Sequence, residues 1–137
     1  MKPKPRRRKP APSLLIQGVR YDIPQRIQII GNVLKVVGGK WKLLIIYHLA
    51  NNELCRFGEL LRKIPGITRR ILTLQLREME KDGLVHRKVY AEVPPRVEYT
   101  ITKEGYALRK VYRQMLYWGA QHHRLIRKAG RGEEKEA

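Results

Sequence analysis

Three side chains between residues 70 and 77 have the types and the spacing that suit recognition of nucleic-acid bases. Arg70, Thr73 and Arg77 lie three and four residues apart, so in an α-helix they share one face. The opposite face carries the large apolar residues Leu72, Leu76 and Met79. Arginine can donate two hydrogen bonds to guanine O6 and N7, and threonine offers a hydroxyl or a methyl group to a base. Taken alone the pattern also fits an ordinary solvated helix face, so the surrounding elements must decide.

Charge favours a polyanionic partner. The 137 residues carry 30 Lys and Arg against 12 Asp and Glu, a formal net charge of +18. Such an excess works against the compact state by self-repulsion, and nucleic acid is the first candidate to neutralise it. The sequence has neither a run of about 18 apolar residues to span a bilayer nor a signal-like stretch. We therefore expect a cytoplasmic, nucleoid-associated protein with no membrane partner.

Helical periodicity dominates the middle of the chain. A first helix is predicted to open at Pro24, with apolar residues at three- and four-residue steps, and to end at Gly38-Gly39. A second is expected over about 40–50 and a third, short one over RFGELLRKI (56–64). The inward face of the second is predicted to consist of Trp41, Leu44, Ile45, His48 and Leu49.

The base-reading pattern falls on a fourth helix. Thr68 is expected to be its N-cap, Pro65-Gly66 precedes it, and Gly83 closes it. Strand-like residues follow over 84–90 and 97–102, joined by a turn at Pro94-Pro95 that carries Arg96, and a long last helix is expected over about 103–128. Two helices joined by a short turn and followed by a hairpin indicate a winged helix-turn-helix. The predicted fold is mainly α with a small β-hairpin and a long C-terminal dimerisation helix.

The two ends of the chain differ from the middle. Residues 1–12 contain six basic residues, four prolines and no acid, a composition that does not form a core. We expect a basic, Pro-rich, flexible N-terminal arm over 1–20, the winged helix-turn-helix domain with its dimerisation helices over 21–128, and a flexible tail over 129–137. The arm either keeps the protein in solution or follows DNA phosphates, as basic arms do in several DNA-binding folds.

Candidate DNA contacts follow from this arrangement, because the second helix of a helix-turn-helix lies in the major groove and the wing lies beside it. For the recognition helix they are Thr68, Arg69, Arg70, Thr73 and Arg77. For the wing they are Arg87, Lys88 and Arg96, and for the DNA backbone Lys40 and Arg56. For the arm they are Arg6, Arg7, Arg8 and Lys9.

Four blocks of sequence closely resemble the HxlR-type transcriptional regulators, winged-helix proteins related to the MarR group. The blocks are GGKWKLLI (38–45), RFGEL (56–60), IPGITRRILTLQLREMEKDGLV (64–85) and VPPRVEYTIT (93–102). The resemblance covers about residues 30–106. It implies a homodimeric DNA-binding regulator whose first and last helices form the dimer interface, with residues 68–81 in the major groove and the hairpin 84–102 as the wing.

Dimerisation also has support from the residues themselves. Apolar and aromatic side chains step by three and four along the last helix, which is too long for so small a domain to bury. The predicted interface consists of Ile27 and Ile30 on the first helix and Val111, Met115, Trp118, His122 and Leu125 on the last. Packing of these two helices within one chain would use part of the same face, and we expect both.

The family's cysteine switch is absent. Many members carry a sensing cysteine about ten residues ahead of the Gly-Gly pair, and here that place is Gln28-Ile29. The single cysteine, Cys55, allows no intramolecular disulfide and no Cys-based zinc site. We interpret it as a packed or partly exposed residue rather than a sensor.

The prediction is therefore a sequence-specific regulator of transcription that binds double-stranded DNA as a homodimer at an inverted-repeat operator. The sequence contains no catalytic, metal-ligand or phosphate-loop motif, so we expect no enzyme, no metal and no cofactor. It identifies no small-molecule effector. Two alternatives stay open: an architectural, chromatin-like protein with little sequence preference, and a basic RNA-binding protein of the translation machinery.

Overall fold

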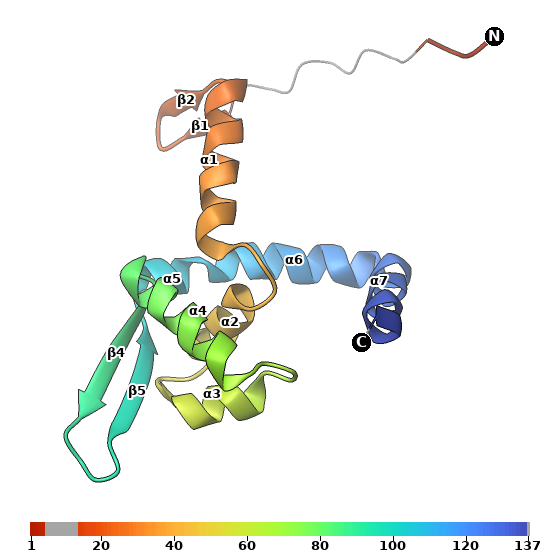
Figure 1. Ribbon diagram of the computed structural model, residues 1–137. Coiled ribbons are helices and arrows are strands. Elements are labelled where there is room, and N and C mark those ends of the chain that lie inside the picture. Colours follow the sequence, from red (N-terminus) through yellow and green to blue (C-terminus); the bar gives the residue numbers. More distant parts are fainter. Residues whose placement is uncertain (5–13, 137) are drawn as a thin grey trace. The chain divides into compact units, whose positions relative to one another are not determined.

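The computed structural model describes residues 1–4 and 14–136 and contains helices and two small sheets (Figure 1). In chain order the elements are β1 (Leu14–Ile16), β2 (Val19–Tyr21), α1 (Ile23–Val37), α2 (Lys42–Ala50), β3 (Cys55–Arg56), α3 (Phe57–Lys63), α4 (Arg69–Lys81), β4 (Val85–Tyr90), β5 (Arg96–Ile101), α5 (Lys103–Ala107), α6 (Arg109–Gln121) and α7 (His123–Glu136). The chain divides into two compact units, one up to residue 36 and one from residue 37.

The first unit contains a hairpin and a helix. β1 and β2 pair antiparallel across a two-residue turn in which Gln17 and Gly18 both have positive φ, the conformation that favours tight hairpins. α1 begins with a reciprocal cap, since Gln25 N donates to Asp22 Oδ1 and Asp22 N donates to Gln25 Oε1. The hairpin lies inside the range expected to be arm. The division into arm, domain and tail otherwise stays a prediction.

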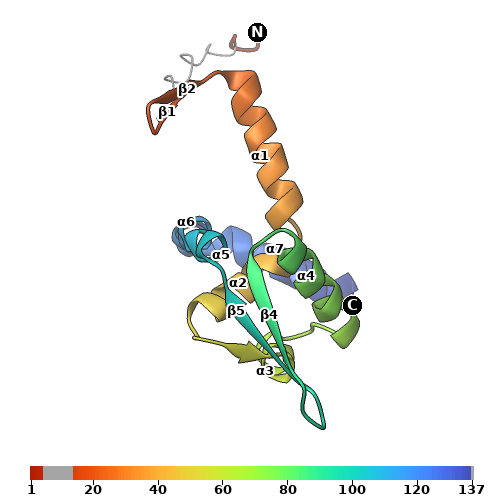
Figure 2. The same cartoon turned by 90° about the vertical axis from the view of Figure 1, so that its left-hand side faces the viewer.

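The second unit is a winged helix. Helices α2, α3 and α4 pack around one core, and β3, β5 and β4 form an antiparallel sheet in that order. Figure 2 shows β4 and β5 extending beyond the helices as a wing. The most deeply buried side chains come from α2, β3, α3 and the residue after it, α4 and β4: Ile45, Ile46, Leu49, Cys55, Leu60, Ile64, Leu72, Leu76, Met79 and Val85.

The predicted fold class and the predicted α4 are confirmed. Thr68 is the N-cap, and its side chain accepts a hydrogen bond from Ile71 N. The residues of α4 that are buried are Leu72, Leu76 and Met79. Gly66 and Gly83, before and after the helix, adopt positive φ, which glycine tolerates without steric cost.

Two expectations about helices were wrong in detail. On α2, Lys42 and Ile46 are buried while Leu44 is 43% exposed, because this helix is apolar nearly all round and its period does not define one inner face. The last helix is broken at Leu108 and at His122, whose backbone leaves the helical region (φ −116°, ψ 38°). Helix then continues to Glu136, into the range expected to be tail.

A buried hydroxyl joins the end of α4 to the wing and to α5. Thr102 Oγ1 donates to Gly83 O at 2.7 Å and accepts from Gly105 N at 3.0 Å, and Thr102 N donates to Leu84 O at 3.1 Å. Gly105 is buried against Leu84 and Ile101. A Cβ on Gly105 would lie 2.2 Å from Leu84 O and 2.9 Å from Ile101 Cγ1. The close approach of these backbones therefore requires glycine.

Replacing Gly105 by alanine should destabilise the second unit. The new methyl group must displace backbone at Leu84, so we expect a loss of about 1–3 kcal/mol, in the range of overpacking, and a melting temperature lower by several degrees. Gly130→Ala is the matched control, because a Cβ there meets nothing within 4 Å. Thermal unfolding followed by circular dichroism measures both, and equal melting temperatures for the two variants would contradict the assignment.

Candidate nucleic-acid interface

The exposed face of α4 brings the predicted base readers together. Arg70 and Arg77 are exposed and Thr73 is half-buried between them. These side chains, with those of Arg69 and Leu74, line one shallow groove on the helix surface. Guanidinium groups flanking a groove can donate in pairs to base edges or to phosphates. The geometry therefore agrees with the face expected from helical spacing.

Hydrogen bonds within the chain limit what some of these residues can offer a ligand. Thr73 Oγ1 donates its proton to Arg69 O at 2.7 Å. In this conformation the hydroxyl can accept a hydrogen bond from a ligand but cannot donate one, and the methyl group remains available for an apolar contact. The Thr68 hydroxyl oxygen caps the helix by accepting from Ile71 N at 3.2 Å. The Arg69 guanidinium lies 5.9 Å from the ring centroid of Phe57 on α3. Arg70 and Arg77 are thus the most available donors of this face.

An ion pair anchors α4 to the core. Lys42 on α2 is buried, its side chain only 8% exposed, and its Nζ lies 2.8 Å from Glu78 Oε2 on α4. An unpaired ammonium in this position would carry a large desolvation cost. Glu78 follows Arg77 directly on α4. One turn of the helix therefore binds the core through Glu78 and exposes Arg77 to solvent. Sequence reasoning missed this role of Lys42.

Arg96 does not lie at the predicted wing tip; it is the first residue of β5, opposite Tyr90. Its Nη2 lies 3.2 Å from Glu92 Oε1 and its Nε 3.7 Å from Glu98 Oε1. Its guanidinium stacks 3.9 Å from the Tyr90 ring centroid, and Nε is buried without a hydrogen-bond partner. The cause is the period of the strand, which places residues 96 and 98 on one face of the sheet. Arg96 therefore stiffens the wing in addition to any contact with a ligand.

Of the other wing and backbone candidates, Lys88 and Arg56 lie beside this cluster, whereas Arg87 and Lys40 lie elsewhere. The register places Lys88 opposite Glu98 on one side, and Arg56 opposite Glu98 on the other. Lys88 Nζ lies 4.8 Å from the Tyr90 ring. Arg87 is exposed on the opposite face of β4. Lys40 is exposed and lies 4.9 Å from the Trp41 ring. The candidates Arg6, Arg7, Arg8 and Lys9 lie outside the described residues.

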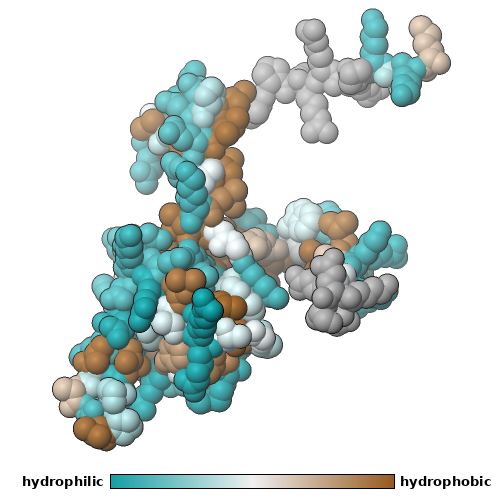
Figure 3. Space-filling view, in the orientation of Figure 1, coloured by the Kyte–Doolittle hydropathy of each residue, from teal (hydrophilic) through white to brown (hydrophobic). Residues whose placement is uncertain are grey.

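Exposed apolar side chains line the helices predicted to dimerise. On α1, Ile27 and Ile30 are 65% and 59% exposed, and Figure 3 shows apolar surface along this helix. On α6 and α7, Val111, Met115, Trp118 and Leu125 are all more than a third exposed, and the His122 ring stacks on Trp118 with centroids 4.4 Å apart. Scattered single residues of this kind need no explanation, but contiguous stripes mark an interaction surface.

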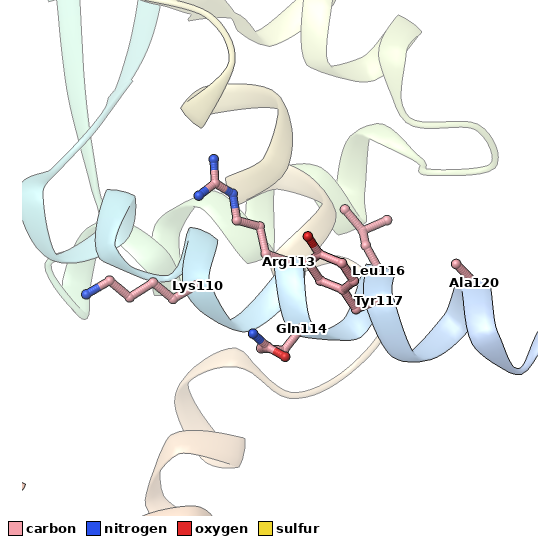
Figure 4. A pocket seen from close by; sticks show the side chains of 6 residues that line it. All are labelled: Lys110, Arg113, Gln114, Leu116, Tyr117 and Ala120. Carbon is pink, nitrogen blue, oxygen red and sulfur yellow. The ribbon is translucent and has the colours of Figure 1, made fainter.

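Sequence reasoning missed part of this apolar surface. Leu116 and Tyr117 are 59% and 69% exposed. They lie off the predicted seam of α6 and line an open groove (Figure 4) with Lys110, Arg113, Gln114 and Ala120. Because α6 is apolar on more than one side, a strict three-and-four step includes three of its five large exposed apolar residues and omits Leu116 and Tyr117. In the described part of the chain, none of the helices has the length and apolarity needed to cross a membrane.

Known proteins with the same pattern identify the family. The sequence model of the HxlR-like helix-turn-helix family matches residues 36–126. The chain belongs to the HxlR family. It is 48% identical over 93 residues to the HTH-type transcriptional regulator YybR of Bacillus subtilis, a match covering 68% of this chain and 74% of YybR. It is 46% identical over 105 residues to the B. subtilis regulator YdeP, covering 74% and 81% of the two chains.

Solved structures agree with this assignment. The reduced form of the redox regulator HypR superimposes with a TM-score of 0.66 at 45% identity, covering 73% of this chain and 98% of HypR. Structural neighbours also include regulators of the MarR family. The HxlR-family chain is thus a transcriptional regulator of the helix-turn-helix type with a winged-helix fold.

The single thiol of this HxlR-family chain is poorly placed for redox sensing. Cys55 is buried (0% exposed) in β3, paired with Tyr99 of β5. Burial raises the pKa of the Cys55 thiol; Lys63 acts in the opposite direction and Glu59 in the same direction. Since the thiolate is the reactive form, both access and ionisation oppose oxidation. Burial, and then Lys63, lower the pKa of His48 on α2.

We predict that thiol reagents leave this regulator unchanged. Cys55 should react with Ellman's reagent at least tenfold more slowly in the native protein than after unfolding, and diamide should not alter DNA affinity. The rate should rise with pH, because the raised pKa delays thiolate formation. Cys55→Ala provides the blank. Rapid native labelling accompanied by release of DNA would contradict this prediction.

Proposed function

We propose that this HxlR-family regulator binds double-stranded DNA as a homodimer and recognises an inverted-repeat operator. The observation that carries the proposal is the exposed arginine pair Arg70 and Arg77 on α4. The Lys42–Glu78 ion pair and the hydrogen bond from Thr102 Oγ1 to Gly83 O hold this helix against the rest of the second unit. The contacts described above suggest which residues bind bases and which bind phosphates. Arg70, Thr73 and Arg77 read bases, while Arg69, Lys40, Arg56, Arg87 and Lys88 contact phosphates.

The wing adds affinity without adding much specificity. Arg96 already has two carboxylates near it, so its charge is largely used within the chain, and its removal would loosen the wing as well as weaken phosphate contacts. Phosphate contacts position a protein on DNA but carry little sequence information. We therefore expect wing substitutions to weaken all sites evenly, and α4 substitutions to change which sites are preferred.

We propose that a second copy of the chain binds the exposed apolar stripes. Ile27 and Ile30 on α1, with Val111, Met115, Trp118, His122 and Leu125 on α6 and α7, form the proposed interface, and Leu116 and Tyr117 extend it. A two-fold axis would place two α4 helices in successive major grooves, about 34 Å apart. This spacing predicts half-sites separated by about one helical turn. The protein would then act in the cytoplasm, at the nucleoid.

The charge of +18 favours a second candidate, an architectural protein that coats DNA with little sequence preference. Selection of bound fragments from a random duplex pool separates the two. A recurring inverted motif supports the operator proposal, and an unenriched pool with a uniform footprint favours the architectural role. Preference for structured RNA over duplex DNA at equal salt would reject both.

Arg70→Ala should relax specificity at one position of each half-site. Loss of a paired contact to guanine costs about 1–3 kcal/mol at that base pair and leaves other positions unchanged. Arg96→Ala is the comparison, with a uniform loss across sequences and no change of motif. Titration of the selected site and of its single-base variants measures both. A uniform loss for Arg70→Ala would remove it from the base readers.

Met115→Glu should shift the protein from dimer to monomer. A carboxylate placed in an apolar interface has no partner and costs several kcal/mol, so we expect the dimer dissociation constant to rise at least about tenfold, which corresponds to 1.4 kcal/mol. Ala91→Glu on the wing introduces the same charge away from the stripe. Sedimentation over a range of concentrations measures the change, and a wild-type protein that is monomeric throughout would refute the proposed dimer.

A further inference from the structure

We infer that α7 carries a second DNA-backbone contact, separate from the recognition helix and the wing. The surface consists of Arg124, Arg127, Lys128 and Arg131, which together we call the α7 basic face. The inference rests on the proposed function, because the partner is the same duplex that the winged helix binds.

Helical geometry gathers these four charges. They occur at intervals of three, four and seven residues from Arg124, so at about 100° per residue they fall within an arc of roughly 100° on α7. Leu125, Ile126 and Ala129 fall on the opposite side by the same rule. α7 is thus amphipathic, with one face suited to an apolar interface and the other to anions.

Exposure and charge identify the kind of partner. All four side chains are exposed, and no carboxylate among the side chains described up to Gly132 pairs with them. From Arg109 to Gly132 the sequence carries seven basic residues and no acidic one. Four adjacent cations that pair with no carboxylate described up to Gly132 repel one another, and a polyanion with regularly spaced phosphates relieves this repulsion by releasing its own counterions.

The position of α7 separates this surface from the winged-helix contacts. Figure 1 shows α7 at the end of α6 that lies away from the wing. The match to the family model ends at residue 126, so Arg127, Lys128 and Arg131 lie beyond the region by which the family is recognised. Three of the four residues of the α7 basic face therefore lie outside the matched region, at a position suited to lengthen the contact along the same DNA.

Salt dependence of DNA binding tests the inference. The variant Arg124→Gln, Arg127→Gln, Lys128→Gln, Arg131→Gln removes the charges and keeps good helix formers. Each phosphate that the protein no longer neutralises should make the slope of log K against log salt shallower by about 0.9, so we expect a change of about 2 or more. Hydroxyl-radical footprinting should show that protection of the backbone outside the half-sites disappears, with the selected motif unchanged.

Two controls make the result specific. Arg124→Lys, Arg127→Lys, Arg131→Lys retains the charge and should retain the slope. Arg20→Gln, Lys35→Gln, Lys81→Gln, Lys103→Gln removes four exposed charges elsewhere and should change the slope by less than half as much. Helix content measured by circular dichroism confirms that α7 remains folded in each variant.

Three results would overturn the inference. One is an equal change of slope for the α7 variant and the scattered variant, and another is an unchanged footprint. The third is loss of binding to phosphatidylglycerol vesicles with DNA affinity intact, which would assign the α7 basic face to a membrane surface. If the wild type enriches no motif, the proposed operator fails, but the salt slopes on any duplex still decide whether α7 contacts DNA.

Discussion

The buried hydroxyl of Thr102 is the contact on which the DNA-binding geometry depends. It joins the carbonyl of Gly83, at the end of α4, to the amide of Gly105, at the start of α5, while its own amide holds Leu84 at the start of the wing. Gly83 itself ends α4 with a positive φ, and Leu84 N returns to Met79 O. Helix α4, the wing and the helices that follow are thereby fixed at one point, so the distance from α4 to the wing is set by covalent and hydrogen-bonded geometry.

Carboxylates in this basic protein have structural roles that leave other cations available. Glu78 compensates buried Lys42, and Glu92 and Glu98 compensate Arg96 within the wing. These pairs hold α4 and the hairpin in place, whereas exposed Arg70, Arg77 and Arg87 point their charge at solvent. Surface ion pairs contribute little stability, but a pair that includes a buried ammonium is costly to break. Acidic residues thus stabilise the arrangement of α4 and the wing, from which the exposed arginines extend into solvent.

Local signals in the sequence were enough for α4 but not for every element. Its cap, its terminating glycine and its apolar period all act within a few residues, and each was predictable. The β1–β2 hairpin lies in the range predicted to be arm, although LLI-QG-VRY (14–21) has apolar residues on both sides of a Gln-Gly turn. Each of its strands is only three residues long, too short to show a period of two. Burial of Lys42 depends on Glu78, 36 residues away, and a local pattern does not show that contact. The ion pairs of Arg96 join residues only two and four positions apart, but they become predictable only once the start of β5 at Arg96 is known.

The large positive charge and the base-reading face serve different parts of the binding free energy. Phosphate contacts made by the wing, the backbone candidates and the α7 basic face would raise affinity for every duplex alike, and salt would weaken them together. Specificity depends on the difference in affinity between the operator and other DNA, and in the proposed complex α4 supplies that difference. In the proposed homodimer, Arg70 and Arg77 of each protomer would give four paired contacts, and at about 1–3 kcal/mol each these would reach the roughly 4–10 kcal/mol that separates specific from non-specific binding in typical regulators. High charge is therefore compatible with sequence recognition, provided that two copies of α4 act on one site.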